Sequence, residues 1–279
     1  MADWSKLKSR GNVEDRRGMN PSVIGGGFGL VGIVIVLVFN LLSGNDPTTS
    51  ILNSLNQLQG STTVQSQGAQ PSQFAGADQY ETFASEVLGS NNDLWKKVLT
   101  ENGKTYQPPK LVLFRTATQS GCGGATSAAG PHYCPRDSTV YLDETFFDEL
   151  RTKFGAKGGD VAEAYVISHE VGHHVQNQLG VMQKLQSQND PAVSVKVELQ
   201  ADCYAGVWSK SVASAGVIKP GEINEAVDAA AAVGDDRIQQ KVEGQINSET
   251  WTHGSSKQRV QWFNTGYDSG SPAQCNTFK

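Results

Sequence analysis

The stretch Ser168–Gly180, SHEVGHHVQNQLG, decides how this chain of 279 residues is interpreted, because it holds three of the five histidines. His169 and His173 lie four positions apart and flank Glu170 in an H-E-x-x-H pattern. Residues four apart share one face of an α-helix, so both imidazoles can reach a single metal ion while Glu170 lies beside it. The pattern is typical of a hydrolytic zinc site, but it is short and also occurs by chance on surface helices.

The overall composition excludes one large class of partners. The formal net charge is −5 and charged residues make up 18% of the chain. No Gly-rich phosphate loop and no run of basic and aromatic residues is present. A nucleic-acid-binding protein usually carries a basic patch. We therefore expect no nucleic-acid partner.

The four cysteines indicate disulfides. They are Cys122, Cys134, Cys203 and Cys275, and none forms a C-x-x-C pair, which argues against a thiolate zinc site or a redox motif. Their even number favours pairing in an oxidising compartment, with free thiols as the alternative. Short separation favours Cys122 with Cys134, a loop whose closure contributes about 3 kcal/mol in the chain-entropy model. Cys203 and Cys275 would then form the second pair.

The N-terminal part of the chain predicts a membrane anchor. Val23–Leu42 reads VIGGGFGLVGIVIVLVFNLL, and a helix of about twenty apolar residues spans the hydrocarbon layer. A cleaved signal peptide is the rival interpretation, but the apolar run is too long and no A-x-A-like site follows it. Basic residues precede the span, whereas the first basic residue after it is Lys96. By the positive-inside rule, the N-terminus is cytoplasmic and the bulk of the chain is extracytoplasmic, in the periplasm or at the cell surface.

These features predict four parts. Residues 1–20 form a basic cytoplasmic N-terminus, 21–43 a single transmembrane anchor, 44–77 a flexible polar linker, and 78–279 the catalytic domain. Gly25 and Gly29 have the G-x-x-x-G spacing that can pair two membrane helices, so the protein could form a homo-oligomer through the anchor. The alternative is that a membrane helix simply tolerates these glycines.

Periodicity predicts a mainly helical α+β domain after residue 77. We expect helical structure over Ala77–Thr100 with a break near Gly89–Asn91, strands at Leu111–Arg115 and Thr139–Leu142, a short helix at Glu144–Phe154 and a long one at Asp160–Leu179. Asp160 is the expected N-cap of the long helix and Gly180 its stop. A strand edge close to the histidine helix could hold an extended peptide.

Two histidines do not complete the site, because catalytic zinc typically has three protein ligands. In the H-E-x-x-H-x-x-G-x-x-H variant the third ligand would follow closely, but those later positions hold Gln176 and Leu179. Glu198 and Asp202 lie four apart in a predicted helix. We expect Glu198 to bind the ion and Asp202 to accept a hydrogen bond from a ligand histidine, although spacing alone also allows Asp202 as the ligand.

Two further residues are candidates for stabilising an oxyanion. His253 and Arg259 are the donors left unassigned in Thr252–Tyr267, where Ser255 or Ser256 could begin a helix. His132 and His174 are interpreted as structural or solvent-exposed.

Five segments together carry a family resemblance. They are SGCGGATSAAGPHYCP (120–135), VYLDETFFDEL (140–150), SHEVGHHVQNQLG (168–180), ELQADCYAGVW (198–208) and HGSSKQRVQWFNTGY (253–267). The chain resembles the putative neutral zinc metallopeptidase family, typically bacterial and membrane-anchored proteins, over most of 78–279. More distantly it is similar to the gluzincin peptidases, except that Gly254 stands where their late histidine motif has proline.

The resemblance implies a zincin-like peptidase domain with a small β-sheet. It implies Zn²⁺ as the cofactor, His169, His173 and Glu198 as its ligands, Glu170 as the general base and Asp202 as the partner of a ligand histidine. With zinc acidifying a water, Glu170 takes the proton, passes it to the leaving amine, and a peptide or protein is cleaved. A catalytically silent, metal-stabilised envelope scaffold is the rival, and hydrolysis of a non-peptide amide is a third reading.

Overall fold

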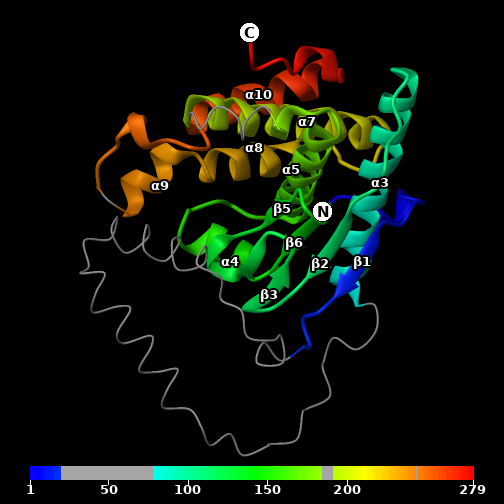
Figure 1. Ribbon diagram of the computed structural model, residues 1–279, viewed down its shortest axis with the longest axis horizontal. Coiled ribbons are helices and arrows are strands. Elements are labelled where there is room, and N and C mark those ends of the chain that lie inside the picture. The colour runs from blue at the N-terminus through cyan, green and yellow to red at the C-terminus, as the bar shows by residue number, and fades with distance from the viewer. Residues whose placement is uncertain (20–77, 184–190, 243) are drawn as a thin grey trace, which may run out of the picture.

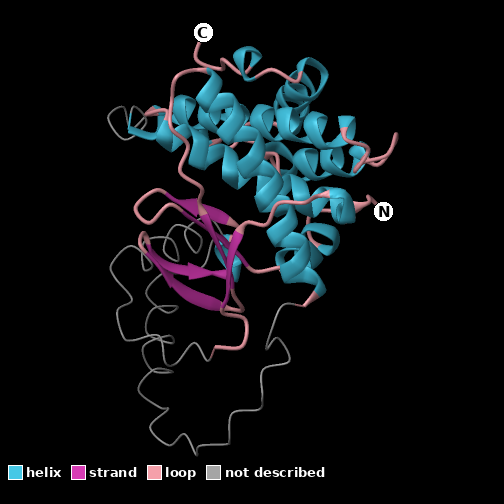
Figure 2. Cartoon of the chain, turned by 90° about the vertical axis from the view of Figure 1, so that its right-hand side faces the viewer, coloured by secondary structure: helices cyan, strands magenta, loops and turns pink. Residues whose placement is uncertain are grey.

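The computed structural model describes residues 1–19, 78–183, 191–242 and 244–279. Figure 2 shows most of the helices at one end of the molecule and the strands toward the other, with helical structure beside the strands. The described chain is a mainly helical α+β structure with small sheets, as expected. The helices are α3 (Gln79–Glu101), α4 (Phe146–Thr152), α5 (Asp160–Gln178), α7 (Pro191–Ser214), α8 (Ile223–Ala232), α9 (Asp235–Val242) and α10 (Ser256–Ser269), with short 3₁₀ turns η1 (Trp4–Lys6), η3 (Ser127–Ala129), η4 (Ser248–Thr250) and η5 (Pro272–Gln274).

The larger sheet has the strand order β1-β2-β6-β5. Its strands are β1 (Asn12–Asp15), β2 (Lys110–Leu113), β6 (Thr139–Leu142) and β5 (His132–Cys134). β1, β2 and β6 run parallel, while β5 pairs antiparallel with β6. β3 (Ala117–Ser120) and β4 (Gly123–Thr126) form a separate antiparallel hairpin. β6 matches its predicted range but lies inside the sheet, so β5 is the edge strand on that side.

The core forms where α5 is enclosed by its neighbours. α5 packs against α7, α8 and α3, and nearly all of its side chains from Val161 to Gln176 are buried. Figure 1 shows α7, α8 and α10 stacked beside α5, with the larger sheet below. Trp95, Trp208 and Phe263 are among the largest fully buried side chains. α5 thus has almost no solvent-exposed face between Val161 and Gln176, and it is the central element of the domain.

α3 is one continuous helix, and the predicted break near Gly89–Asn91 is wrong. A Cβ atom at Gly89 would lie 2.5 Å from the backbone oxygen of Ser9. The glycine is therefore explained by the close passage of the N-terminal segment across the helix, which no local pattern reveals. Asn91 is buried and donates to the Val87 carbonyl at 3.0 Å, so it too fits within the helix.

Residues 1–19 are an integral part of this domain, contrary to the expected separate N-terminus. β1 pairs with β2 along its whole length. The backbone N–H of Ala2 and the indole N–H of Trp4 both donate to Asp160 Oδ2, at 3.0 and 2.8 Å. Through these two hydrogen bonds, Asp160 anchors the N-terminal segment to α5. Asp160 is the first residue of α5, and the N-cap position expected of it is occupied by Gly159.

Two basic residues of this segment, Arg10 and Arg17, pair with carboxylates of the domain. Arg10 pairs with Glu86 at 2.6 Å. Arg17 is buried and pairs with Asp15 at 2.8 Å, with Asp78 at 3.0 Å and with Glu144 at 3.0 Å. The charge of these two arginines therefore serves intramolecular ion pairs with the domain.

The expected single-pass topology is wrong. Because β1 and β2 are hydrogen-bonded neighbours, the N-terminal segment and the domain lie on the same side of any bilayer, not on opposite sides. Across the described ranges, we find no helix with both the length and the apolar character that a transmembrane span requires. The predicted anchor (21–43, with Gly25 and Gly29) and linker (44–77) lie outside the described residues.

Both expected disulfides are present. Cys122 pairs with Cys134 and joins the β3–β4 hairpin to the edge strand β5. Cys203 pairs with Cys275 and fastens α7 to the C-terminal tail. Cys203 is the residue after Asp202, so the second bridge lies beside the site described below.

Candidate metal centre

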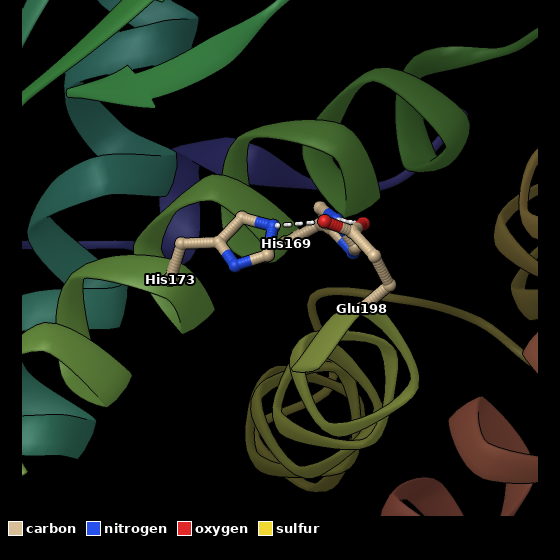
Figure 3. Close-up of side chains that lie close together, drawn as sticks. All are labelled: His169, His173 and Glu198. Carbon is tan, nitrogen blue, oxygen red and sulfur yellow. Dashed lines mark hydrogen bonds and ion pairs between the residues drawn. The ribbon is translucent and has the colours of Figure 1, made fainter. Parts of the chain in front are cut away.

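α5 and α7 bring the three expected ligands together. Gly172 lies where the two helices cross, and a Cβ there would lie 3.2 Å from Ala201 Cα, so its absence allows their close approach. His169 Nε2 is 3.2 Å from Glu198 Oε2, and His173 Nε2 is 3.4 Å from Glu198 Oε1. One ligand atom from each of the three residues lies within 4.8 Å of the others. Figure 3 shows the two imidazoles of α5 and the carboxylate of α7 turned toward a common point.

Asp202 fixes the orientation of His169. Its Oδ1 is 2.9 Å from His169 Nδ1, which directs Nε2 toward Glu198. Tyr165 donates its hydroxyl to the same Oδ1 at 2.5 Å. Spacing alone allowed either Glu198 or Asp202 to bind the ion. In the structure Glu198 faces the two imidazoles, whereas Asp202 is fully buried and contacts the Nδ1 side of His169. Tyr165 was not identified from the sequence, where its position among the apolar residues of α5 resembles that of a core aromatic.

Arg259 lines the cleft, but its guanidinium is held by Asp202. Its Nε donates to Asp202 Oδ2 at 2.8 Å and its Nη2 to Oδ1 at 2.9 Å, while Nη1 donates to the Val233 carbonyl at 3.1 Å. Arg259 is only 3% exposed. A guanidinium held by this many acceptors positions the carboxylate and is poorly placed to donate to an oxyanion, which differs from the role expected for it.

Gln176 orients the second histidine. Gln176 Oε1 is 2.9 Å from His173 Nδ1, and its amide N–H donates to the Val197 carbonyl at 2.8 Å and to Gln200 Oε1 at 3.1 Å. Each ligand histidine therefore has its Nδ1 held by an oxygen acceptor and its Nε2 left for the ion. The sequence carried a usable signal, because Gln176 follows His173 by three residues and shares its helix face.

The charges of the site favour a cation. Burial lowers the pKa of His169, but the carboxylates of Asp202 and Glu198 outweigh this effect and raise the pKa to about 10. The pKa of His173 is also raised, since Glu198 more than offsets burial. Burial alone would raise the pKa of Glu198, yet the two histidines hold it well below its usual value. Two imidazoles and one carboxylate are a donor set that suits zinc.

His253 approaches the site from a loop. Its Nδ1 is 3.2 Å from Asp235 Oδ1, and the backbone N–H groups of Thr252, His253 and Gly254 donate to Asp235 Oδ2 at 2.9, 2.7 and 2.8 Å. The imidazole is half exposed and lines the same cleft as Glu198. Asp235 was missed because 18 residues separate it from His253, and nothing in the sequence links them.

His169, His173 and Glu198 line a cleft of about 480 Å³. Glu170, 7% exposed, lines it beside them, and the segment from η3 into β5 forms one wall. Other lining residues are Phe146, Glu149, Phe154, Tyr165, Val166, Met182, Ser194, Val197, Val233, Ile238 and Arg259.

The two remaining histidines, expected to be structural or solvent-exposed, both contact neighbouring side chains. His174 is buried, with Nδ1 3.0 Å from the hydroxyl of Tyr133 and Nε2 2.6 Å from the Gln107 carbonyl. It therefore joins α5 to the edge strand β5. His132 stacks on Tyr141 at a centroid distance of 5.4 Å, at the rim of the cleft.

Comparison with known proteins places the chain in a family. The family model described as "Putative neutral zinc metallopeptidase" matches residues 2–278. The uncharacterized protein YpfJ of Escherichia coli K12 is 43% identical over 287 residues, covering 99% of this chain and 98% of YpfJ. The uncharacterized proteins Rv2575 of Mycobacterium tuberculosis H37Rv and Mb2605 of Mycobacterium bovis are 46% identical over 218 residues, covering 73% of each chain. No solved structure matches. The chain therefore belongs to the putative neutral zinc metallopeptidase family.

Proposed function

We propose that this protein is a zinc metallopeptidase of the gluzincin type, with His169, His173 and Glu198 as the zinc ligands. The observation that carries the proposal is the convergence of these three residues beside Glu170 at the floor of an open cleft. Asp202 and Gln176 support it, because each holds the outer nitrogen of one ligand histidine. A purely structural zinc site is usually closed by four ligands and has no use for a neighbouring base.

Zinc, when bound, supplies a Lewis acid that acidifies water and polarises a carbonyl oxygen. The remaining chemistry belongs to the chain. Glu170 takes a proton from the attacking water and returns it to the leaving amine, because it lies one residue after His169 on the face lining the cleft. His253, held by Asp235, donates to the oxygen on which negative charge develops.

The edge strand β5 is the surface best placed to bind the backbone of a substrate. β5 pairs with β6 on one side only, and its residues His132 and Tyr133 line the cleft. An extended peptide can add to such an edge by main-chain hydrogen bonds. This position takes over the role expected of the strand at Thr139–Leu142, which is paired on both sides.

Incubation of the full-length protein with a reduced and alkylated unstructured protein tests the proposal. The full chain is required because residues 1–19 belong to the fold. We expect new peptide fragments that disappear when the zinc chelator 1,10-phenanthroline is added and return when zinc is restored. Stoichiometric zinc binding without fragments from any unstructured substrate would favour the rival, a catalytically silent metal-stabilised scaffold.

A further inference from the structure

The edge strand β5 is joined to the helix that carries two of the proposed ligands. β6 pairs with the backbone of β5 on one side, and the Cys122–Cys134 disulfide ties it to the β3–β4 hairpin. α5, which carries His169 and His173, packs directly against β5, and the two lie beside each other in Figure 1. The contacts between α5 and β5 therefore set the distance from the ligand histidines to the strand edge.

Tyr133 makes this connection from the β5 side. Side chains alternate along a strand, so Tyr133 points to the opposite face from its neighbours His132 and Cys134. Tyr133 is 8% exposed and belongs to the main hydrophobic core, whereas Cys134 packs in a separate cluster. The ring of Tyr133 meets that of His174 on α5 edge-on, at a centroid distance of 5.4 Å. Tyr133 therefore faces the helix.

Two residues of α5 hold the Tyr133 hydroxyl. Asn177 donates its side-chain N–H to this oxygen at 3.0 Å, and His174 Nδ1 lies 3.0 Å from it. His174 Nε2 is 2.6 Å from the Gln107 carbonyl, which can only accept, so we assign the proton to Nε2. Nδ1 of the neutral ring then accepts from the Tyr133 hydroxyl. This hydroxyl both donates and accepts, which fixes its direction relative to α5.

The link between α5 and β5 is polar although it lies in the core. His174 is only 1% exposed. An apolar side chain could fill the same space, but apolar contacts are not directional, whereas a buried hydrogen-bond network holds its members in one geometry. Neither His174 nor Asn177 is among the residues that line the cleft, so neither is placed to touch a substrate. Their contact with Tyr133 is the route by which they reach the site.

We infer that His174 and Asn177 are positioning residues for the substrate, because they hold the β5 edge in place through the Tyr133 hydroxyl. This inference rests on the proposed peptidase function, with β5 as the strand that binds the substrate backbone. A peptide that pairs with a fixed edge is oriented without first ordering the strand. When the hydroxyl is removed, part of the binding free energy must order β5 instead. That loss is equal in the bound substrate and in the transition state, so KM rises while kcat holds.

Steady-state kinetics with a fluorogenic peptide on the full-length protein tests the inference. In Tyr133→Phe, KM should rise about three- to tenfold, the range expected when a neutral hydrogen bond is lost. In Asn177→Ala, which removes one of the two contacts of the hydroxyl, KM should rise at least about twofold. The double variant should have the KM of Tyr133→Phe alone, because both changes remove the same contact. We expect kcat and zinc content to stay at the native values.

Tyr106→Phe is the matched control. Tyr106 is buried and its ring also meets His174 edge-on, at 5.7 Å, but its hydroxyl donates to Asn92 of α3 at 2.9 Å. This variant should lower the midpoint of thermal unfolding about as much as Tyr133→Phe and leave KM unchanged. An equal rise of KM in Tyr106→Phe would reduce the effect to general stability and overturn the inference.

The remaining outcomes separate this inference from the proposed function. A rise of KM in Tyr133→Phe with a native KM in Asn177→Ala would mean that the hydroxyl touches the substrate directly, and the inference would be wrong. Native KM values in both variants would overturn it as well, and the peptidase proposal would stand. Absence of turnover by the native protein would overturn the peptidase proposal and this inference with it.

Discussion

The two sides of the metal centre are built differently. On the α5–α7 side, His169, Asp202 and Arg259 are buried side chains of helices, joined by consecutive hydrogen bonds. On the loop side, His253 is half exposed and is held mainly through Asp235. A buried hydrogen-bond network on helices holds its side chains in one geometry. A residue on a loop can instead move to fit a substrate. The comparison suggests that one side holds the ion and the other responds to the reaction.

Removal of Arg259 should have the largest effect on the buried side. Arg259→Gln leaves the Asp202 carboxylate buried without its cationic partner, and such a change costs about 3–5 kcal/mol of unfolding free energy. Urea denaturation of the native protein and the variant measures it. The exposed Arg136 supplies a matched control, because Arg136→Gln should change stability by less than about 0.5 kcal/mol. A stable Arg259→Gln protein that had lost only kcat would instead support the oxyanion role first expected for Arg259.

Removal of His253 should affect catalysis and leave the fold intact. His253→Gln deletes the proposed oxyanion donor, and loss of one such donor lowers kcat by about 100- to 1000-fold. Zinc content and the midpoint of unfolding should stay near the native values, because the imidazole is half exposed. Steady-state kinetics with a fluorogenic peptide checks the result. A fall in zinc content would place His253 with the metal-holding side and break the comparison.

Asp202→Asn should weaken zinc binding without abolishing it. The amide can still accept from His169 Nδ1 but no longer carries the charge that favours a bound cation. Changes to such outer partners lower metal affinity by about 10- to 100-fold. Competition with a chromophoric chelator measures the dissociation constant. An unchanged dissociation constant would mean that the His169–Asp202 contact does not contribute to zinc affinity.

Gln176→Leu should have a smaller effect on zinc affinity than Asp202→Asn. The variant removes the acceptor for His173 Nδ1, but Gln176 is neutral, so only orientation is lost. We expect a loss near the lower end of the range, about tenfold. The same competition assay applies, and a loss equal to that of Asp202→Asn would show that charge adds nothing to the buried network.

Asp235→Asn should shift the pH dependence of kcat. Burial lowers the pKa of His253, but Asp235 and Glu198 outweigh it, so the pKa is raised. An imidazolium donor is present below this pKa and is lost as pH rises through it. Removing the Asp235 charge lowers the pKa, so the alkaline limb of the kcat profile should move to lower pH. An alkaline limb of the kcat profile at the same pH as in the native protein would mean that protonation of His253 does not affect turnover.

The sequence predicted the parts of the fold that depend on local periodicity. The helix at Asp160–Leu179 and the strand at Thr139–Leu142 agree with α5 and β6, because an apolar helical repeat and a short β-branched run are local signals. His169, His173 and Glu198 were proposed together because spacing on two helices implied two shared faces. These inferences needed no knowledge of how the chain is arranged in space.

The sequence failed where the arrangement in space decides the outcome. The basic residues before Met19 resembled a membrane flank, but two of them, Arg10 and Arg17, pair with distant carboxylates of the domain, Glu86 and Glu144. Gly89 resembled a helix break, but it lies within α3 at the point where the Ser9 backbone passes close to the helix. Ser9 is far from Gly89 in the sequence, so no local pattern shows this contact. Asp235 and Tyr165 act through partners far away in sequence. Such pairings carry no local periodicity from which they could be read.

In the proposed mechanism Glu170 links the two sides, since it belongs to α5 and is the proposed general base. If Glu170 is the general base, Glu170→Gln should keep zinc at the native stoichiometry while kcat falls by at least about 100-fold, the usual minimum contribution of such a base. Glu149→Gln is the matched control, because Glu149 lines the same cleft and lies on α4, away from the ligands. Elemental analysis and peptide hydrolysis on the three proteins give the answer. Native turnover in Glu170→Gln would contradict the account.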